Sequence, residues 1–420
     1  MPLSIVRGVR LLHTSDWHLG RLMDKASLLD EQAAAIDRMV DIARDQQVDL
    51  VVISGDLYDR AIPPAPAVEL FSDALSRLRD TGARVVAISG NHDSAARVGF
   101  ADQLLARTGV TVRADVRRAS EPVIITSRSG DEALVVFPIP YLDPLSVAPL
   151  LPEGSDAGAD AGAGETGEGA PSSSGRRPGH VQVLDWALGR ARAKLGAANI
   201  AGLPSVVVAH AFVTNTTTPA QVSASERELS IGGTDRVHTS LFDGFDYVAL
   251  GHLHGQQSWD DGRVAYSGTP LPYSFSEQHH TKGVRIVDLA ADGSRSVTSI
   301  ALGVGRPLCT LTGTLEELLA DPAHAAAEAA RVRAVLTDAV LPSQAMARLR
   351  QRFAHASELV HQPQLGPAAP GPTLSPTRVR NASPYELTVQ FVTEQLGDAP
   401  DADDDALLRE AVLAATGATS

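Results

Sequence analysis

Short apolar runs alternate with longer amphipathic stretches along the first 300 positions of the chain. The runs are rich in β-branched residues, which predicts strands that are buried on both faces, as in a parallel sheet. Such strands are expected at residues 9–14, 49–54, 83–89, 205–209 and 247–251. Apolar residues at helical spacing predict helices between them, at residues 28–46, 68–78, 95–108 and 180–195. Strands that alternate with helices in this way indicate an α/β fold.

The pattern changes after a second group of strands, expected at residues 122–127, 133–138, 263–267, 283–289 and 295–301. From about residue 306, Thr314-Leu-Glu-Glu317 forms a capping box that opens a helix. Strands near 332–336 and 358–361 and a helix near 343–353 complete a compact module. We therefore divide this part of the chain into a large domain at residues 1–305 and a small α/β module at 306–362.

The end of the chain predicts two short helices beyond a linker. Residues 363–382 are rich in proline, as linkers often are. Ser383-Pro-Tyr-Glu386 supplies an N-cap, a proline at the first helical position and a glutamate at the third, and a second helix is expected at about 403–415. Two such helices have little core of their own. We expect segment 383–420 to bury its apolar face, with Leu387 and Phe391, on a partner; packing back on the same chain is the alternative.

The composition is that of a soluble globular protein, with 44% hydrophobic residues over 420 positions. No stretch approaches the roughly 18 apolar residues of a membrane span, and the N-terminus leads into a strand instead of a signal sequence. A single cysteine, Cys309, excludes an internal disulfide framework. These features fit a cytoplasmic protein.

The net charge of −14 argues against nucleic-acid binding until its location is considered. Residues 152–178 contribute −3 and residues 398–420 contribute −5. The first of these segments is rich in glycine, alanine and glutamate without periodicity, so we expect a disordered insertion there. More than half of the excess charge thus lies outside the expected core. A nucleic-acid function stays open, because bound metals and a basic partner can supply positive charge.

Five of the predicted strands end in side chains that can bind a metal. In Val51-Val-Ile-Ser-Gly-Asp56, a carboxylate follows a buried strand, at the edge where α/β sheets place their sites. Each strand end has an ordinary interpretation by itself, as a turn or a packed histidine, and His13 inside the first strand is interpreted as packed. Together the strand ends predict a metal centre with the candidate ligands Asp16, His18, Asp56, Asn91, His210, His252 and His254.

This ligand set indicates which ions the centre would hold. Oxygen and imidazole ligands without a thiolate suit Mn, Fe or Zn and suit calcium poorly. Seven candidates exceed the needs of one tetrahedral ion, so we infer two ions roughly 3.5–4 Å apart with a shared carboxylate between them. Asp56 is the expected bridge, because each of its two oxygens could reach a different ion.

The order of these motifs carries a family resemblance. Asp-x-His, Gly-Asp, Gly-Asn-His-Asp, a strand-terminal histidine and Gly-His-x-His follow one another as in the calcineurin-like binuclear metallophosphoesterases. Within that group the chain closely resembles the SbcD family of bacterial nuclease subunits in His13-Thr-Ser-Asp-Trp-His-Leu-Gly20, Gly55-Asp-Leu-Tyr-Asp-Arg60, Gly90-Asn-His-Asp-Ser94 and Ser267-Gly-Thr-Pro-Leu-Pro-Tyr-Ser-Phe-Ser-Glu277. The resemblance implies a four-layer αββα sandwich, with residues 306–362 as a capping domain and the helix pair at the C-terminus.

The resemblance also implies roles for individual residues. One ion would be held by Asp16, His18, Asp56 and His254, and the other by Asp56, Asn91, His210 and His252. His92 would protonate the leaving oxygen or stabilise the transition state, with Asp93 orienting it. Asp59 stands where eukaryotic and archaeal relatives carry a histidine, so we assign it no catalytic role; an ion pair with Arg60 is its simplest interpretation.

The implied activity is that of a manganese-dependent DNA nuclease in recombination, repair and replication. It would act with ATP as an exonuclease on duplex ends and as an endonuclease on single strands and hairpins. The implied partners are an SbcC-type ATPase, which would receive the C-terminal helices, and a second copy of the chain, joined through residues 68–79 and 94–107.

Two other functions compete with the nuclease. A phosphomonoesterase or phosphodiesterase acting on a small molecule or phosphoprotein would use the same metal motifs. Phosphatases of that type typically carry Gly-Asn-His-Glu, whereas Asp93 stands here, and they lack the capping module. A tethering subunit without catalysis is disfavoured by the complete ligand set, because clustered charges are costly to keep in place without a use.

Overall fold

The computed structural model describes residues 8–130, 133–152, 178–197, 199–226, 236–363, 383–396 and 399–416. The chain divides into two compact units, residues 1–362 and 363–420. The insertion expected at 152–178 and the linker expected at 363–382 lie, apart from their end residues, outside the described residues. No helix in the described ranges is both long enough and apolar enough to cross a membrane.

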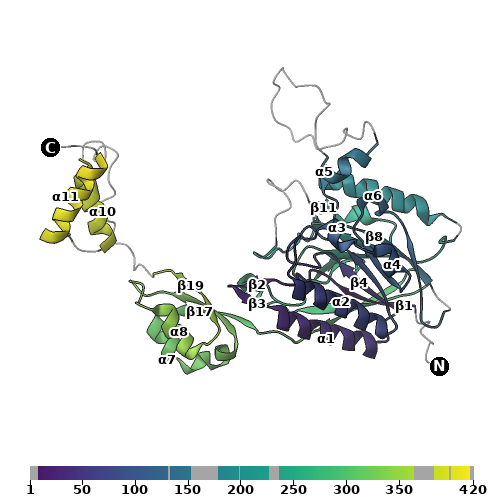
Figure 1. Cartoon of the computed structure of the whole chain (residues 1–420), viewed down its shortest axis with the longest axis horizontal. Helices are drawn as coiled ribbons and strands as arrows, with labels where there is room; N and C mark the ends of the chain where they lie inside the picture. Colours follow the sequence, from purple (N-terminus) through teal and green to yellow (C-terminus); the bar gives the residue numbers. More distant parts are fainter. Residues whose placement is uncertain are drawn as a thin grey trace, which may run out of the picture. The chain divides into compact units, whose positions relative to one another are not determined.

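The first of two large sheets contains the N-terminal strand (Figure 1). Its order is β16 (Arg295–Ala301), β15 (Gly283–Leu289), β1 (Val9–Thr14), β4 (Leu50–Ser54), β5 (Arg84–Ile88) and β6 (Val110–Arg113). The strands from β1 to β6 in this order are parallel, and β15 and β16 are antiparallel additions at one side. The carboxyl ends of β1, β4 and β5 therefore meet at one edge of the sheet.

The second sheet repeats this arrangement. Its order is β13 (Gln257–Trp259), β14 (Val264–Tyr266), β12 (Tyr247–Gly251), β9 (Ser205–His210), β8 (Ala133–Ile139) and β7 (Val123–Thr126). The four central strands are parallel, and β7 and β13 are antiparallel edges. The carboxyl ends of the parallel neighbours β9 and β12 therefore also lie side by side.

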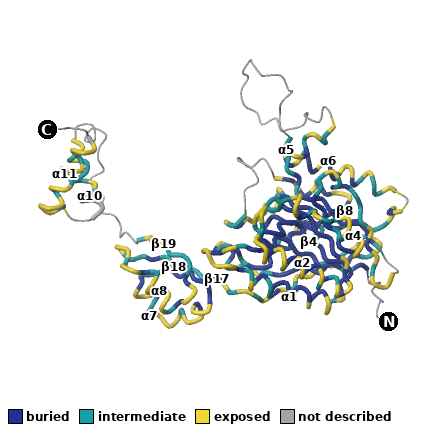
Figure 2. Tube along the Cα trace, in the orientation of Figure 1, coloured by how far each residue is buried: buried dark blue, intermediate teal, exposed yellow. Residues whose placement is uncertain are grey.

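The two sheets pack face to face, because successive residues of each strand point to opposite sides. Leu50 and Val52 belong to the core between the sheets, whereas Val51 and Ile53 belong to the core under α1 (Leu29–Asp45) and α2 (Ala65–Asp80). The second sheet packs in the same way against α6 (His180–Leu195). Figure 2 shows that the buried trace is concentrated in these strands. The predicted αββα sandwich is confirmed.

Several elements differ from the prediction. The helix expected at 95–108 is two short helices, α3 (Ala95–Val98) and α4 (Asp102–Ala106). Gly99 weakens helix propensity there, and Ala101 has a left-handed backbone with φ 59°. Strand β6 was not predicted, nor were the short elements β2 (Leu22–Met23), β3 (Ala26–Ser27), η1 (Val116–Arg118), α5 (Pro144–Val147), η2 (Ala148–Leu150), β10 (Val213–Thr214), β11 (Val237–His238), η3 (Thr239–Phe242), β13, η4 (Phe275–Glu277) and η5 (Pro322–Ala329).

Residues 308–361 form a three-stranded parallel sheet with helices α7 (Leu315–Ala320) and α8 (Ala345–Arg352). The strand order is β17 (Leu308–Gly313), β18 (Arg331–Leu336) and β19 (Ala356–His361), of which β17 was not predicted. The capping box that opens α7 is confirmed. The module has its own core and is tied to the large domain by an ion pair of 3.0 Å between Arg331 and Glu31.

The C-terminal unit contains the two predicted helices, α10 (Pro384–Leu396) and α11 (Ala402–Thr416). Ser383 caps the first: its Oγ accepts the N–H of Glu386 at 3.2 Å, and the Glu386 carboxylate accepts the N–H of Ser383 at 2.7 Å. No residue at 383–393 or 399–415 is buried. The described part of this unit therefore has no core of its own.

Candidate metal centre

The loops that follow β1 and β4 are joined to each other by backbone hydrogen bonds. The N–H of Asp16 donates to the carbonyl of Gly55 at 3.0 Å, and the N–H of His18 donates to the carbonyl of Asp56 at 2.9 Å. The parallel pairing of the two strands thus continues past their ends. The side chains of the Asp-x-His and Gly-Asp motifs are held next to one another as a result.

Four of the predicted ligands have a left-handed backbone, which side chains rarely adopt. Their φ angles are 53° at Asp16, 46° at His18, 46° at Asp56 and 111° at His252. Such conformations are unfavourable and tend to persist where the surrounding structure needs a side chain aimed in an unusual direction. Four of the eleven described non-glycine residues with positive φ are thus predicted ligands at one edge, which favours a functional site there.

Two glycines allow the loops that carry the candidate ligands to approach one another closely. A Cβ atom on Gly90 would lie 2.1 Å from Oδ1 of Asp56, and one on Gly55 would lie 2.3 Å from Nδ1 of His210. Gly55 also has φ 91°, which favours glycine. Any other residue at either position would push a candidate ligand out of place.

The carboxylate of Asp56 lies at the centre of the cluster. Its Oδ2 is 3.6 Å from Nε2 of His18 and 3.5 Å from Nε2 of His210. Its Oδ1 accepts the backbone N–H of His92 at 2.9 Å. Oδ2 therefore faces both groups of ligands, and Oδ1, which accepts one hydrogen bond, keeps a second lone pair.

The other candidates surround Asp56 in two overlapping groups. Ligand atoms of Asp16, His18 and His254 lie within 4.8 Å of one another, as do those of Asp16, Asp56 and His210. The side-chain oxygen of Asn91 is 2.8 Å from Nε2 of His210. The ring of His252 packs edge-on against that of His210, with centroids 5.4 Å apart. The structure therefore brings all seven predicted side chains to one edge.

The charges and lone pairs in this cluster fit a bound cation. Burial and the neighbouring Asp56 raise the pKa of Asp16, and burial and neighbouring imidazoles lower the pKa of His18 and His252. The Nε2 atoms of His18 and His254 face each other at 3.3 Å. Buried Nδ1 of His18 has no hydrogen-bond partner among the described residues. Divalent ions would offset the repulsion between carboxylates and accept the imidazole lone pairs, so the residues fit the two-ion site.

The ring of His92 is hydrogen-bonded to the backbone of the Gly-Asp loop. Its Nδ1 lies 2.8 Å from the backbone carbonyl of Asp59, which can only accept, so Nδ1 carries a proton. The Asp93 carboxylate instead accepts the backbone N–H groups of Leu57, Tyr58 and Gly90. The hydrogen bond that orients the His92 ring in the structure is thus the one to the carbonyl of Asp59. Asp93 ties the Gly-Asn-His-Asp loop to the Gly-Asp loop, and burial, followed by the charge of Asp56, raises its pKa to about 7.

Asp59 has a closer partner than the expected one. Its carboxylate is 3.1 Å from Arg21 and 3.9 Å from Arg60. Arg21 follows the Asp-x-His motif, so this ion pair joins the same two loops as the backbone hydrogen bonds. Asp59 also lies with His18 and His92 in a third group of ligand atoms within 4.8 Å.

The sequence interpretation missed a buried network behind His254. Ser225 bonds Nδ1 of His254 at 2.7 Å and also donates to Glu277. Lys282 donates to Glu277 and, at 2.9 Å, to the carbonyl of His254. Against the effect of burial, His254 and Lys282 lower the pKa of Glu277. The network fixes the ring so that Nε2 faces the cluster. The signal available in the sequence was Glu277, the one charged residue of the motif at residues 267–277.

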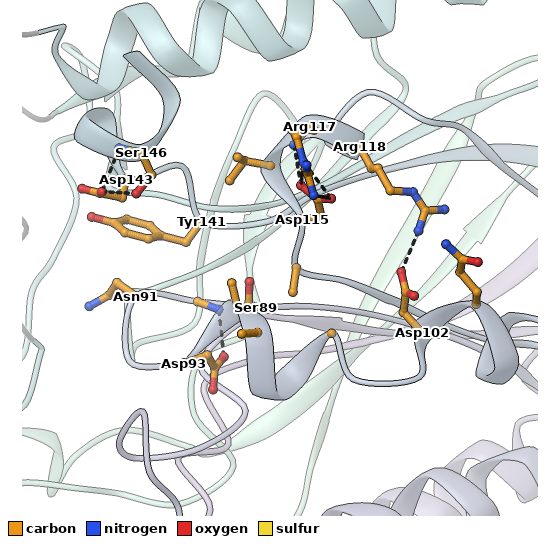
Figure 3. Close-up of a pocket in the computed structure, with 17 residues that line it drawn as sticks. Ser89, Asn91, Asp93, Asp102, Asp115, Arg117, Arg118, Tyr141, Asp143 and Ser146 are labelled. Carbon is orange, nitrogen blue, oxygen red and sulfur yellow. Dashed lines mark hydrogen bonds and ion pairs between the residues drawn. The ribbon is translucent and has the colours of Figure 1, made fainter. Parts of the chain in front are cut away.

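A cavity of about 820 Å³ adjoins the cluster at Asn91 (Figure 3). Its walls come from the ends of β5, β6 and β8, from η1 and from α3, α4 and α5. Of the seven candidate ligands, Asn91 lines this cavity, and its volume admits a molecule larger than water.

Two stacked sheets, with carboxylates, imidazoles and an amide gathered at the ends of their parallel strands, define a calcineurin-like phosphoesterase. The family model with that description matches residues 9–139. This range carries the first three motifs of the cluster.

The chain is 33% identical over 308 residues to the SbcD subunit of the nuclease SbcCD from Bacillus subtilis, covering 71% of each chain. It is 30% identical over 318 residues to the SbcD subunit of the same nuclease from Escherichia coli K12, covering 74% of this chain and 73% of that relative. The chain belongs to the family of these SbcD subunits and is a hydrolase of phosphodiester bonds.

Proposed function

We propose that this chain is the nuclease subunit of an SbcCD-type complex and that it cleaves DNA hairpins and double-strand ends with two manganese ions. The convergence of six candidate ligands around Asp56, with Asn91 also lining a cavity, is the observation that carries this proposal. Cleavage of duplex ends would depend on ATP through the partner. DNA recombination, repair and replication are the processes that use such cleavage.

The residues of the cluster have distinct tasks in this mechanism. Two divalent ions would activate a water and neutralise the charge on the phosphoryl oxygens during in-line attack. Asp16, His18, Asp56 and His254 would hold one ion, and Asp56, Asn91, His210 and His252 the other. His92 keeps its Nδ1 proton on the carbonyl of Asp59, which directs Nε2 away from that loop. Protonated His92 would donate from Nε2 to the leaving oxygen.

Digestion of a labelled DNA hairpin with Mn²⁺ tests this function. The purified chain is expected to open the hairpin, and His92→Asn is expected to slow cleavage by about 10²–10⁴-fold because the proton donor is lost. His238→Asn is the matched control, since His238 is exposed and caps η3, a role that asparagine also fills. A wild-type chain that hydrolyses p-nitrophenyl phosphate but leaves the hairpin intact would support the phosphomonoesterase instead.

We also propose that an SbcC-type ATPase binds the C-terminal unit. The helices α10 and α11 display Phe391 and Leu407 with exposed fractions of 61% and 64%. Apolar side chains exposed on paired short helices are suited to docking on a partner helix or coiled coil.

A homodimer through α2, α3 and α4 is the second partnership that we propose. Phe100 is 80% exposed and Leu104 64% exposed, and Val68 on α2 is also exposed. Phe100→Glu is expected to convert a dimer to a monomer in light scattering, because a charge would be buried in the contact. Val340→Glu is the control, since Val340 is equally exposed at 80% on the capping module. An unchanged mass for Phe100→Glu would place the contact elsewhere.

A further inference from the structure

The cavity beside Asn91 has an aromatic wall. The ring of Tyr141, which follows β8, lies between Asn91 on one side and Asp143 and Ser146 on the other (Figure 3). The volume of about 820 Å³ lies within the roughly 300–1,000 Å³ of pockets that bind small molecules. A group attached to a phosphate in the metal cluster could therefore enter this cavity next to Tyr141.

The position of Tyr141 is set by its neighbours. Its backbone N–H donates to the carbonyl of Ser89 at 2.8 Å, which ties it to the end of β5. Its ring meets that of His210 edge-on, with centroids 6.2 Å apart and planes at 85°, and lies 5.7 Å from that of His180. An aromatic ring held against a candidate metal ligand is a preorganised surface, because little side-chain entropy is left to lose on binding.

The walls select against a phosphate and favour a neutral, flat group. The cavity is lined by four carboxylates and two guanidinium groups, so its charged side chains favour neither an anion nor a phosphodiester backbone. Two of the carboxylates pair with arginines: Asp115 with Arg117 at 2.7 Å and Asp102 with Arg118 at 2.6 Å. Small and apolar residues supply much of the remaining wall: Ala95, Ala96, Gly99, Ala114 and Val116.

The same segment, residues 95–106, also carries apolar side chains that are exposed to solvent. Ala95, Ala96, Gly99, Asp102 and Gln103 line the cavity, whereas Phe100 and Leu104 are not among the lining residues and are exposed. The cavity and the proposed dimer contact thus use different side chains of residues 95–106. A dimer formed through Phe100 leaves the cavity walls available.

We propose that this cavity is a nucleobase subsite in which Tyr141 stacks on the base of a nucleotide next to the scissile phosphate. The proposal rests on the proposed nuclease function and names the part of the substrate that this cavity receives. Stacking on a base is tolerant of sequence, since every base has a flat π-face. A base can enter only when it is unstacked from its duplex neighbours, which favours hairpin loops, single strands and frayed ends as substrates.

Cleavage of a hairpin in which single bases near the cut are removed tests the proposal. In the wild type, an abasic nucleotide at one position beside the cut is expected to slow cleavage by about 10-fold. Tyr141→Ala is expected to slow cleavage of intact DNA by a similar factor, with no additional loss when the same base is missing. Tyr141→Phe keeps the ring and is expected to stay within about twofold of the wild type.

A second readout does not depend on turnover. A 2-aminopurine at the sensitive position is expected to lose fluorescence on binding to the His92→Asn chain, because stacking quenches it, and to stay bright when Tyr141→Ala is added. Additive losses from Tyr141→Ala and the abasic site, or equal quenching with and without the tyrosine ring, would overturn the subsite. Failure of the wild type to cleave any hairpin would overturn the nuclease function instead, and the fluorescence measurement would still decide whether a base binds here.

Discussion

Replacement of Asp56 by alanine is expected to remove both metal ions together and to lower DNA cleavage by more than about 10³-fold. Its Oδ2 lies 3.6 Å from His18 and 3.5 Å from His210, so one atom faces both groups of ligands. Its Oδ1 also holds the backbone N–H of His92. The substitution would therefore disturb both proposed ion sites and the position of His92, the proposed proton donor, at once.

Metal analysis of the purified variant, alongside hairpin cleavage, measures this effect. Asp288→Ala is the matched control, because Asp288 pairs with Arg10 at the opposite end of β1. We expect the Asp56 variant to stay folded without metal, since the change relieves repulsion between Asp56 and buried Asp16. Full retention of one ion would mean that another group provides the bridge.

Deletion of residues 383–420 is expected to abolish co-purification with the ATPase partner. The deleted helices include the exposed side chains Phe391 and Leu407. The metal cluster lies in the other unit, residues 1–362, so manganese-dependent cleavage of a hairpin by the isolated shortened chain is expected to persist. Loss of binding with retained cleavage would separate partner recognition from catalysis.

A single substitution sharpens this test. Phe391→Asp is expected to weaken partner binding by at least about 10-fold, because a buried aromatic anchor typically contributes more than about 1.4 kcal/mol to a contact. Glu410→Ala, at an exposed polar position on α11, is expected to bind as the wild type does. Undiminished retention of the ATPase by the shortened chain would show that the partner docks on residues 1–362.

Elements with an uninterrupted pattern were predictable to the residue. The strand at 9–14, the helix at 180–195 and the strands at 283–289 and 295–301 have the predicted bounds. Residues next to these elements signalled where each one ends. Strands β6 and β17 instead depend on pairing with β5 and β18. Ala101 similarly takes a left-handed backbone that its own side chain does not favour. Tertiary packing overrode local preference at these places.

The residue types of the candidate site were predictable from the sequence, whereas the hydrogen-bond partners of its side chains were less so. Each ligand follows a buried strand directly, so the ends of parallel strands were expected to bring the ligands to one edge. The hydrogen-bond partner of a side chain depends on which other loop packs next to it. Asp93 therefore binds backbone N–H groups of another loop, and His92 meets the carbonyl of Asp59.

The sequence by itself determined the α/β class, the order of the strands that end in metal-binding residues, and the chemical type of each candidate ligand. These are local properties, since strand burial and a terminal carboxylate or imidazole are written in consecutive residues. The tertiary structure alone decided that Oδ2 of Asp56 faces both ligand groups, that Ser225, Glu277 and Lys282 support His254, and that Tyr141 lines the adjoining cavity. Those contacts join residues from strands and loops far apart in the chain, and side-chain geometry across such distances follows from packing.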